Sequence, residues 1–358
     1  MTRKNLPAPL SPPTTEPPAV RRPVTQKQIA QRVGVTQQLV ALALKNSPNV
    51  AEATRAKILE VAEELGYNAN ANRSARALAA ARHGTRVKND IIALIFEAMP
   101  DVAPVAMPYF MPLVDGIEIE TGERQLDLFL VRNKPASLPW LIRDGWVDGV
   151  ILLGSHDSVA EITALDVPVM TLGSRLPGTT GITPADANGT ALATHHLIEL
   201  GHRRIAYLGP QLGWPSARER LQGYTDAMRA AGLPTDAKLQ EMTLTNVLED
   251  DGQSGMTSLL ERGEFTALVC HNDAVAMGAI RVAQSRGLDV PDDLSVTGFD
   301  DTSAASGFVP AVTSVGFSGL EMGRAAVRML LDEQFNGQHR EFPVELRVHQ
   351  SSAPPRRG

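Results

Sequence analysis

Cysteine is almost absent from this chain, which has 358 residues and one cysteine, Cys270. A single cysteine excludes an internal disulfide framework and agrees with a reducing compartment. No apolar run reaches the roughly 18 uninterrupted residues that a membrane-spanning helix requires. The N-terminal segment MTRKNLPAPLSPPTTEPPAVRRP lacks the apolar stretch of a secretory signal. We therefore expect a cytoplasmic protein with no membrane association.

Motifs of the common enzyme classes are also missing. The chain contains no P-loop, GxSxG, HExxH or CxxC pattern. His195 and His196 are neighbours in a predicted helix and so point in different directions, which is unsuited to binding one metal ion. We expect no catalytic activity, no cofactor and no metal site.

Composition and charge indicate a globular protein with one basic module. The chain is 43% hydrophobic and 21% charged, as in ordinary soluble proteins, and its length predicts two or three domains. Residues 21–83 carry ten lysines or arginines and four glutamates, a net charge of +6, whereas residues 84–358 carry −13. A small basic module beside a large acidic body predicts a polyanionic partner for the module alone.

Composition and hydrophobic pattern divide the chain into four parts. Residues 1–22 contain six prolines and are expected to be disordered, because they cannot bury enough apolar surface to offset their ordering entropy. Residues 23–68 hold three helical patterns. Residues 69–86 are rich in alanine and arginine and are expected to form a hinge helix or linker. Residues 87–358 form the remaining body.

The three helical patterns resemble a DNA-reading helix-turn-helix with a supporting helix. Thr25 and Thr36 are placed to cap the first two helices. Ala30 is small where these helices must approach each other, and Gly34 lies where the turn requires a positive φ. The third pattern, EATRAKILEVAEELGY, places its apolar residues at three- and four-residue spacing, on one face.

Beyond residue 89, short apolar runs alternate with amphipathic helices. The runs include DIIALIF, QLDLFLV, GVILLG, RIAYLG, TALVCHND and LSVTGFDD. Uniformly apolar strands followed by helices predict parallel sheets covered on both faces. Their total length predicts two doubly wound subdomains, with a ligand cleft at the carboxyl ends of the strands.

Together these segments resemble the LacI/GalR family of bacterial transcription repressors. The resemblance rests on VTQKQIAQRVGVTQQLVALAL, VAEATRAKILEVAEELGY, NRSARAL, HLIELGHRRIAYLG, ARERLQGYTDAMRAAGL, CHNDAVAMGAIRVAQSRGLDVPDDLSVTGFDD and PAVTSV, in the family's order. It implies a helix-turn-helix headpiece, a hinge helix and a periplasmic-binding-protein-like core. It also implies a homodimer on an operator, controlled by a small effector.

Several residues match the family's DNA-contacting positions. Gln37 and Gln38 match base-reading positions at the start of the recognition helix, and glutamine is able to read adenine in the major groove. Leu78 matches a leucine that wedges into the minor groove, with Arg76 beside it. The positions expected to touch phosphate are Thr25, Thr36, Asn46, Thr54 and Arg55.

Two departures from the family pattern concern DNA recognition. Ala41 and Leu42 replace the usual serine and arginine of the recognition helix, which predicts a different operator, with Leu42 meeting a thymine methyl group. The segment after Tyr67 is two residues longer than in the family and has Ala71 where proline would stand. This insertion changes the spacing between Tyr67 and the hinge segment around Leu78 relative to the family.

Three polar residues at predicted strand ends match the family's effector-binding positions: Arg220, Asn272 and Asp300. Aspartate accepts from hydroxyl groups, arginine donates as a fork, and asparagine does both, as suits a hydroxylated ligand. The neighbouring Asp273 is expected only to cap a helix.

The opposite subdomain is predicted to contribute Glu97 and an aromatic pair, Tyr109 and Phe110. The aspartate that the family often has after the strand VPVMTL is replaced here by Gly173. A sugar or sugar derivative is the favoured effector, and a nucleobase-like compound is the alternative. A transporter's solute-binding protein would share the core fold, but a basic headpiece argues against that function.

Overall fold

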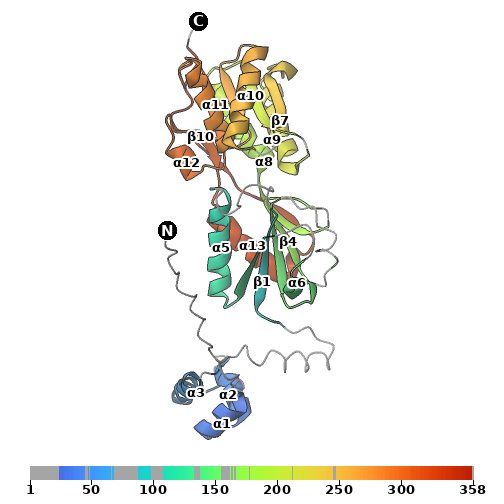
Figure 1. The fold of residues 1–358 in the computed structure, drawn as a ribbon, viewed down its shortest axis with the longest axis vertical. Coiled ribbons are helices and arrows are strands. Elements are labelled where there is room, and N and C mark those ends of the chain that lie inside the picture. The colour runs from blue at the N-terminus through green and yellow to red at the C-terminus, as the bar shows by residue number, and fades with distance from the viewer. Residues whose placement is uncertain are drawn as a thin grey trace, which may run out of the picture. The chain divides into compact units, whose positions relative to one another are not determined.

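The computed structural model consists of two compact units, residues 1–87 and 88–358, which are considered separately (Figure 1). Figure 1 draws the residues that the structure describes as coloured ribbons. These are residues 24–44, 47, 49–65, 67, 88–97, 108–132, 138–154, 162, 164, 167–176, 178–211, 213–244 and 247–356, without the side chains at 96, 97, 132 and 243.

The first unit contains the three helices that the sequence predicts. They are α1 (Gln26–Val33), α2 (Gln37–Leu44) and α3 (Glu52–Glu64). Ile29, Val40 and Ile58, one from each helix, are fully buried and form the centre of a small core. Gly34 adopts a φ of 77° between α1 and α2, a conformation that costs L-residues with a side chain about 1–2 kcal/mol.

The second unit contains two six-stranded sheets, which confirms the predicted pair of α/β subdomains (Figure 1). In the first sheet every strand is parallel to its neighbours, in the order β11-β5-β4-β3-β1-β2. The strands are β1 (Ile91–Glu97), β2 (Asp127–Arg132), β3 (Gly149–Gly154), β4 (Val169–Leu172), β5 (Thr180–Pro184) and β11 (His339–Phe342).

Both faces of the first sheet are covered, as its uniformly apolar strands require. Alternate residues of β1 join different cores: Ile92 and Leu94 pack with α5 (Phe110–Glu123) and α13 (Gly319–Leu331). Ile91 and Ile95 pack on the other face, with α6 (Trp140–Arg143). Because successive residues of β1 are buried on opposite faces of the sheet, the strand shows no alternation of polar and apolar residues in the sequence.

The second sheet has the order β12-β10-β9-β8-β6-β7 and is parallel except for β12, which is antiparallel to β10. Its strands are β6 (Ile205–Pro210), β7 (Gln240–Leu244), β8 (Ala267–Cys270), β9 (Ser295–Phe299), β10 (Thr313–Gly316) and β12 (Glu345–Arg347). The helices are α8 (Asp186–Glu199), α9 (Pro215–Ala230), α10 (Glu249–Arg262), α11 (Asp273–Ser285) and the short α12 (Ser303–Ser306), with 3-10 turns η3 (Ala237–Leu239) and, in the first subdomain, η4 (Glu333–Phe335).

The chain passes between the two sheets three times: after β5, after β10 and after β11. All three of these strands end at a passage, so the carboxyl ends of both parallel sheets face the same region. Polar residues that follow the strands are thereby brought together. The apolar pattern predicts the strands but does not reveal that α13 and β11 return to the first sheet.

Candidate functional site

Arg220 is at the centre of a buried polar cluster at the strand ends. Its side chain is only 7% exposed. Nε donates to Asp186 Oδ1 at 2.6 Å, and Nη1 donates to the backbone oxygen of His271 at 2.5 Å. The guanidinium carbon lies 3.6 Å from the ring centre of Phe299. These partners begin α8, follow β8 and end β9, so the arginine ties three strand ends together.

Asp300 follows β9 and turns its carboxylate toward Arg220. Oδ1 of Asp300 lies 3.6 Å from Nη2 of Arg220, beyond hydrogen-bond distance. Oδ1 is buried and has no hydrogen-bond partner among the described residues. Burial raises the pKa of Asp300 well above its usual range, against the opposing effect of Arg220. An unsatisfied buried carboxylate oxygen is costly and can accept from a ligand.

Tyr109 brings the first subdomain to this cluster. It precedes α5, and its ring packs edge-on against Phe317, with ring centres 5.9 Å apart. A methyl group added at Gly173 would lie 3.2 Å from the Tyr109 hydroxyl, so the two approach closely. Burial, and then the charge of Asp300, raises the pKa of Tyr109. Tyr109 of the first subdomain therefore lies close to Asp300 of the second.

Asn272, also predicted to bind the effector, uses its amide for the fold. Its Oδ1 accepts from the backbone N–H of Val275 at 2.9 Å and caps α11. Its Nδ2 donates to the backbone oxygen of Val247 at 3.0 Å. Asn272 is next to His271, which accepts from Arg220, but its own polar atoms bond within the second subdomain.

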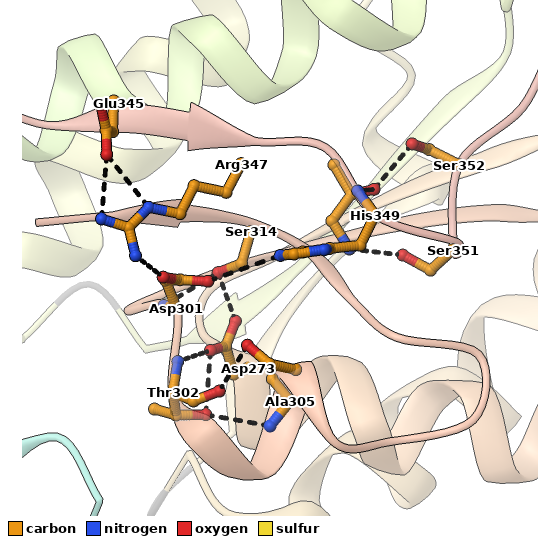
Figure 2. Close-up of polar contacts among 12 residues, drawn as sticks. Asp273, Asp301, Thr302, Ala305, Ser314, Glu345, Arg347, His349, Ser351 and Ser352 are labelled. Atoms are coloured by element: carbon orange, nitrogen blue, oxygen red, sulfur yellow. Dashed lines mark hydrogen bonds and ion pairs between the residues drawn. The ribbon is translucent and has the colours of Figure 1, made fainter.

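The expectation that Asp273 caps a helix is wrong, because Asn272 is the cap. Asp273 is the first residue of α11 and accepts from the backbone N–H of Thr302 at 2.7 Å and the hydroxyl of Ser314 at 2.5 Å (Figure 2). Burial raises the pKa of Asp273 to about 6, although these hydrogen bonds act to lower it. The carboxylate thus joins α11 to the segments after β9 and within β10.

Asp301 holds the turn that carries Asp300. Both residues have positive φ, 104° for Asp300 and 47° for Asp301, which is uncommon for residues with a side chain. The Asp301 carboxylate pairs with Arg347 of β12, and its backbone N–H donates to the Ser314 hydroxyl at 3.0 Å (Figure 2). A methyl group at Gly316 would lie 2.7 Å from Asp301 Cβ. Asp301 therefore contacts strands at two of the three passages.

The remaining predicted cleft residues belong to the first subdomain. Glu97 ends β1, and its side chain lies outside the described part of the structure. Phe110 opens α5 and packs onto the core of that sheet. Asp186, which accepts from Arg220, is a member of this polar cluster that the sequence reasoning missed. It follows the buried strand β5 as Asp300 follows β9, and this position is the signal that could have identified it.

In the first unit, the two threonines cap helices as predicted. The hydroxyl oxygen of Thr25 accepts from the backbone N–H of Gln28 at 3.4 Å. The backbone N–H of Thr25 donates to the side-chain oxygen of Gln28, which completes a capping box. Thr36 accepts from the Leu39 backbone at 3.2 Å. Gln37 and Gln38, the first residues of α2, are exposed.

Other predicted DNA-contacting residues are more engaged in packing. Ala41 is half-buried, and Leu42 is half-buried and packs against the three-helix core. Thr54 is half-buried. Arg55 donates to the backbone oxygens of Ser47 at 2.6 Å and Val50 at 3.3 Å. The residues that lie outside the described part are Asn46, Arg76, Leu78 and the whole predicted hinge, 69–86.

Histidine and carboxylate side chains show no metal-binding arrangement in the described residues. His202 is 1% exposed and bonds to Thr266 and Ser295, which makes it a core residue. His196 bonds to the hydroxyl of Ser352 at 2.9 Å. Within the same described ranges, no helix has the length and apolar character needed to cross a membrane.

Comparison with known proteins places these units in a family. The model for bacterial regulatory proteins of the lacI family matches residues 25–70, and the periplasmic binding protein-like domain matches residues 194–352. The chain is 33% identical over 346 residues to the HTH-type transcriptional regulator GalR of Escherichia coli (strain K12), covering 92% of this chain and 96% of GalR. The chain belongs to the LacI family of bacterial transcriptional regulators.

Further members of the family resemble this regulator over most of its length. The HTH-type transcriptional repressor CytR of E. coli (strain K12) is 31% identical, covering 88% of this chain and 91% of CytR. The structure of the transcriptional regulator CelR–cellobiose complex is 27% identical, with a TM-score of 0.68, and covers 92% of this chain and 100% of that one. The lac repressor dimer bound to operator and the anti-inducer ONPF, 24% identical with a TM-score of 0.71 over 92% of this chain and 99% of that one, shares the fold. These relatives are regulators, not enzymes.

Proposed function

We propose that this regulator is a repressor that binds operator DNA as a homodimer through α2. The observation that carries the proposal is the exposed pair Gln37 and Gln38 at the start of α2, on a helix-turn-helix whose caps and glycine turn are all formed. Their amides are free of the core and able to read base edges in a major groove. A two-fold operator would match a two-fold dimer. With DNA as its target, the protein acts in the cytoplasm.

The contacts with phosphate and the minor groove are part of the same proposal. Thr25, Thr36, Asn46 and Thr54 would contact phosphate oxygens, while Arg76 and Leu78 would reach the minor groove. For Arg55 the hydrogen bonds to Ser47 and Val50 favour a structural role over a phosphate contact. The packing of Leu42 against the helical core leaves Gln37 and Gln38 as the main base readers.

A sugar or sugar derivative in the cleft is proposed to control operator binding. The Oδ1 of Asp300, which accepts no hydrogen bond from the described residues, offers an acceptor, the Nη2 of Arg220 a donor, and the Tyr109 ring an apolar surface. This combination suits a hydroxylated ring, and CelR was solved with cellobiose. Glu97 and Phe110 would complete the first-subdomain side, with Asn272 near the opposite side. Neither a cofactor nor chemical turnover of the ligand is part of this function.

Selection of binding sites from random DNA tests both halves of the proposal. The full chain is expected to enrich a two-fold symmetric sequence, and Gln37→Ala with Gln38→Ala to lose about 1–3 kcal/mol of discrimination per lost base contact. A sugar or nucleobase that changes binding to that sequence then identifies the effector. Asp300→Ala should abolish this response and retain operator binding. Failure to enrich any sequence would refute the DNA-binding function.

A further inference from the structure

The cluster around Arg220 contains more negative than positive charge. Asp186 and Asp300 have side chains only 2% and 9% exposed, and both pair with the same guanidinium. The Nη1 of Arg220 is occupied by the backbone oxygen of His271. Two buried carboxylates therefore share one buried cation, and only Asp186 is within hydrogen-bond distance of it.

Among the described residues, no group that faces Asp300 supplies a second positive charge. Tyr109 faces it from the start of α5 and Asp273 from α11, and both are neutral or acidic. His271, which follows β8, is buried, and burial followed by the charge of Arg220 holds its pKa well below the usual range. His271 is therefore neutral, and the carboxylate of Asp273 bonds to Thr302 and Ser314.

Acidic side chains also face Asp186. Burial raises the pKa of Asp186 against the lowering effect of Arg220, and Glu341 of β11 adds a smaller increase. Glu219 of α9 also lies near Asp186, and its own basic neighbours are Arg175 and Arg218. In the part of the chain that the structure describes, Arg220 is thus the cation that pairs with both Asp186 and Asp300, and one guanidinium cannot neutralise two carboxylates.

We propose that Asp186 and Asp300 together hold one proton in the effector-free protein, and that the effector replaces it. Asp186 keeps its charge because it accepts from Arg220 Nε, so the proton lies on Asp300, whose Oδ1 has no other donor. An O–H or N–H of the ligand donates to Oδ1, and the carboxyl proton leaves to solvent. Because the two carboxylates are coupled, the titration belongs to the pair.

This mechanism restricts the chemical class of the effector, a step that rests on the proposed function of the cleft. A neutral polyhydroxylated ligand or an amine supplies donors to Asp300 without adding negative charge. A phosphate or carboxylate would bring a further anion beside the charged Asp186 and would supply no hydrogen-bond donor to replace the proton on Asp300, with one arginine group, Nη2, left to receive it. The cleft therefore favours unphosphorylated sugars and amino sugars.

Unfolding of the ligand-free full chain tests the shared proton directly. A carboxyl group whose folded pKa is raised contributes stability below its unfolded pKa and loses it as pH rises through the folded pKa. Wild type should therefore be less stable at pH 8 than at pH 5. Asp300→Asn and Asp186→Asn should each remove part of this loss, because one carboxylate then has Arg220 to itself. At pH 8 we expect each single variant to unfold at a midpoint about 3 °C above that of wild type, whereas at pH 5 the midpoints should be similar.

The double variant and a surface control make the test decisive. Asp186→Asn with Asp300→Asn leaves Arg220 buried without a carboxylate and should lower the midpoint at every pH, a reversal of sign that independent sites would not give. Asp226 is on α9, as Arg220 is, but it forms an exposed pair with Arg229. Asp226→Asn should therefore leave the pH dependence unchanged. Single variants with the wild-type pH dependence would overturn the proposal, whether or not the protein binds an operator.

The ligand class is tested with matched probes in the same assay. At pH 8, cellobiose, glucose and glucosamine are compared with glucose 6-phosphate for their effect on the unfolding midpoint. We expect no phosphorylated sugar to stabilise the protein more than its unphosphorylated parent. A larger shift with glucose 6-phosphate than with glucose would overturn the restriction on effector class, while operator binding, measured separately, would be unaffected.

Discussion

Arg55 and Arg220 show at the scale of single residues how partners determine the role of a side chain. Both match positions of functional arginines in the family, one expected at DNA and one at the effector. Arg220 is surrounded by acidic and aromatic groups at the strand ends. Arg55 instead donates to two backbone oxygens in the turn between α2 and α3. The residue type alone could not distinguish these environments.

Substitution of Arg55 separates a structural role from a phosphate contact. Arg55→Lys retains the charge but loses the fork that reaches Ser47 and Val50, and we expect it to destabilise the three-helix unit by about 1–3 kcal/mol. Operator affinity should fall because less of the unit is folded. If Arg55 instead contacts phosphate, Arg55→Lys should change operator affinity little. In that case Arg55→Met should reduce the salt slope of operator binding by about 1. Thermal unfolding and salt titration measure the two effects.

Elements that depend on local sequence were predicted well. Thr25 and Thr36 cap the first two helices, and Gly34 adopts the positive φ that the turn requires. The doubly wound subdomains also follow from alternating apolar strands and helices. Asp186 was missed because an acidic residue at the start of a helix is common, and its partner Arg220 is 34 residues away. Asp273 was misjudged because its hydrogen bonds to Thr302 and Ser314 form only in the folded sheet.

The contact between α5 and α13 depends on glycine. A methyl group at Gly116 would lie 2.0 Å from the backbone oxygen of Leu320, so Gly116→Ala must force the helices apart. We expect it to lower the unfolding free energy by about 1–3 kcal/mol, as overpacked cores do. Gly122→Ala, on the same helix with nothing within 4 Å, should instead stabilise by up to about 1 kcal/mol. Denaturant unfolding compares the two, and equal effects would contradict the close packing.

The whole molecule combines a basic first unit with an acidic second one. Residues 21–83 carry +6, whereas residues 84–358 carry −13. Attraction to the phosphate backbone must therefore come from the first unit, while the second unit repels DNA at low salt. Such a distribution limits where nucleic acid can bind.

Salt titration of operator binding by the full chain tests this division of charge. The logarithm of the binding constant should fall linearly with the logarithm of salt concentration, by about 0.9 per phosphate neutralised. Arg356→Gln, which removes an exposed arginine from an acidic surface of the second unit, should leave that slope unchanged. Binding that does not depend on salt would contradict a contact through the basic unit.

The three passages between the sheets also bear on how the protein is made. The first sheet lacks β11 along the edge of β5 until residues 339–342 have been synthesised. Its core is also incomplete until α13 contributes Met322, Val327 and Leu330. A nascent chain emerging from the ribosome therefore cannot finish its first subdomain before the second is almost entirely translated. Chains stopped before α13 would expose the apolar face of the first sheet and become substrates for chaperones and proteases.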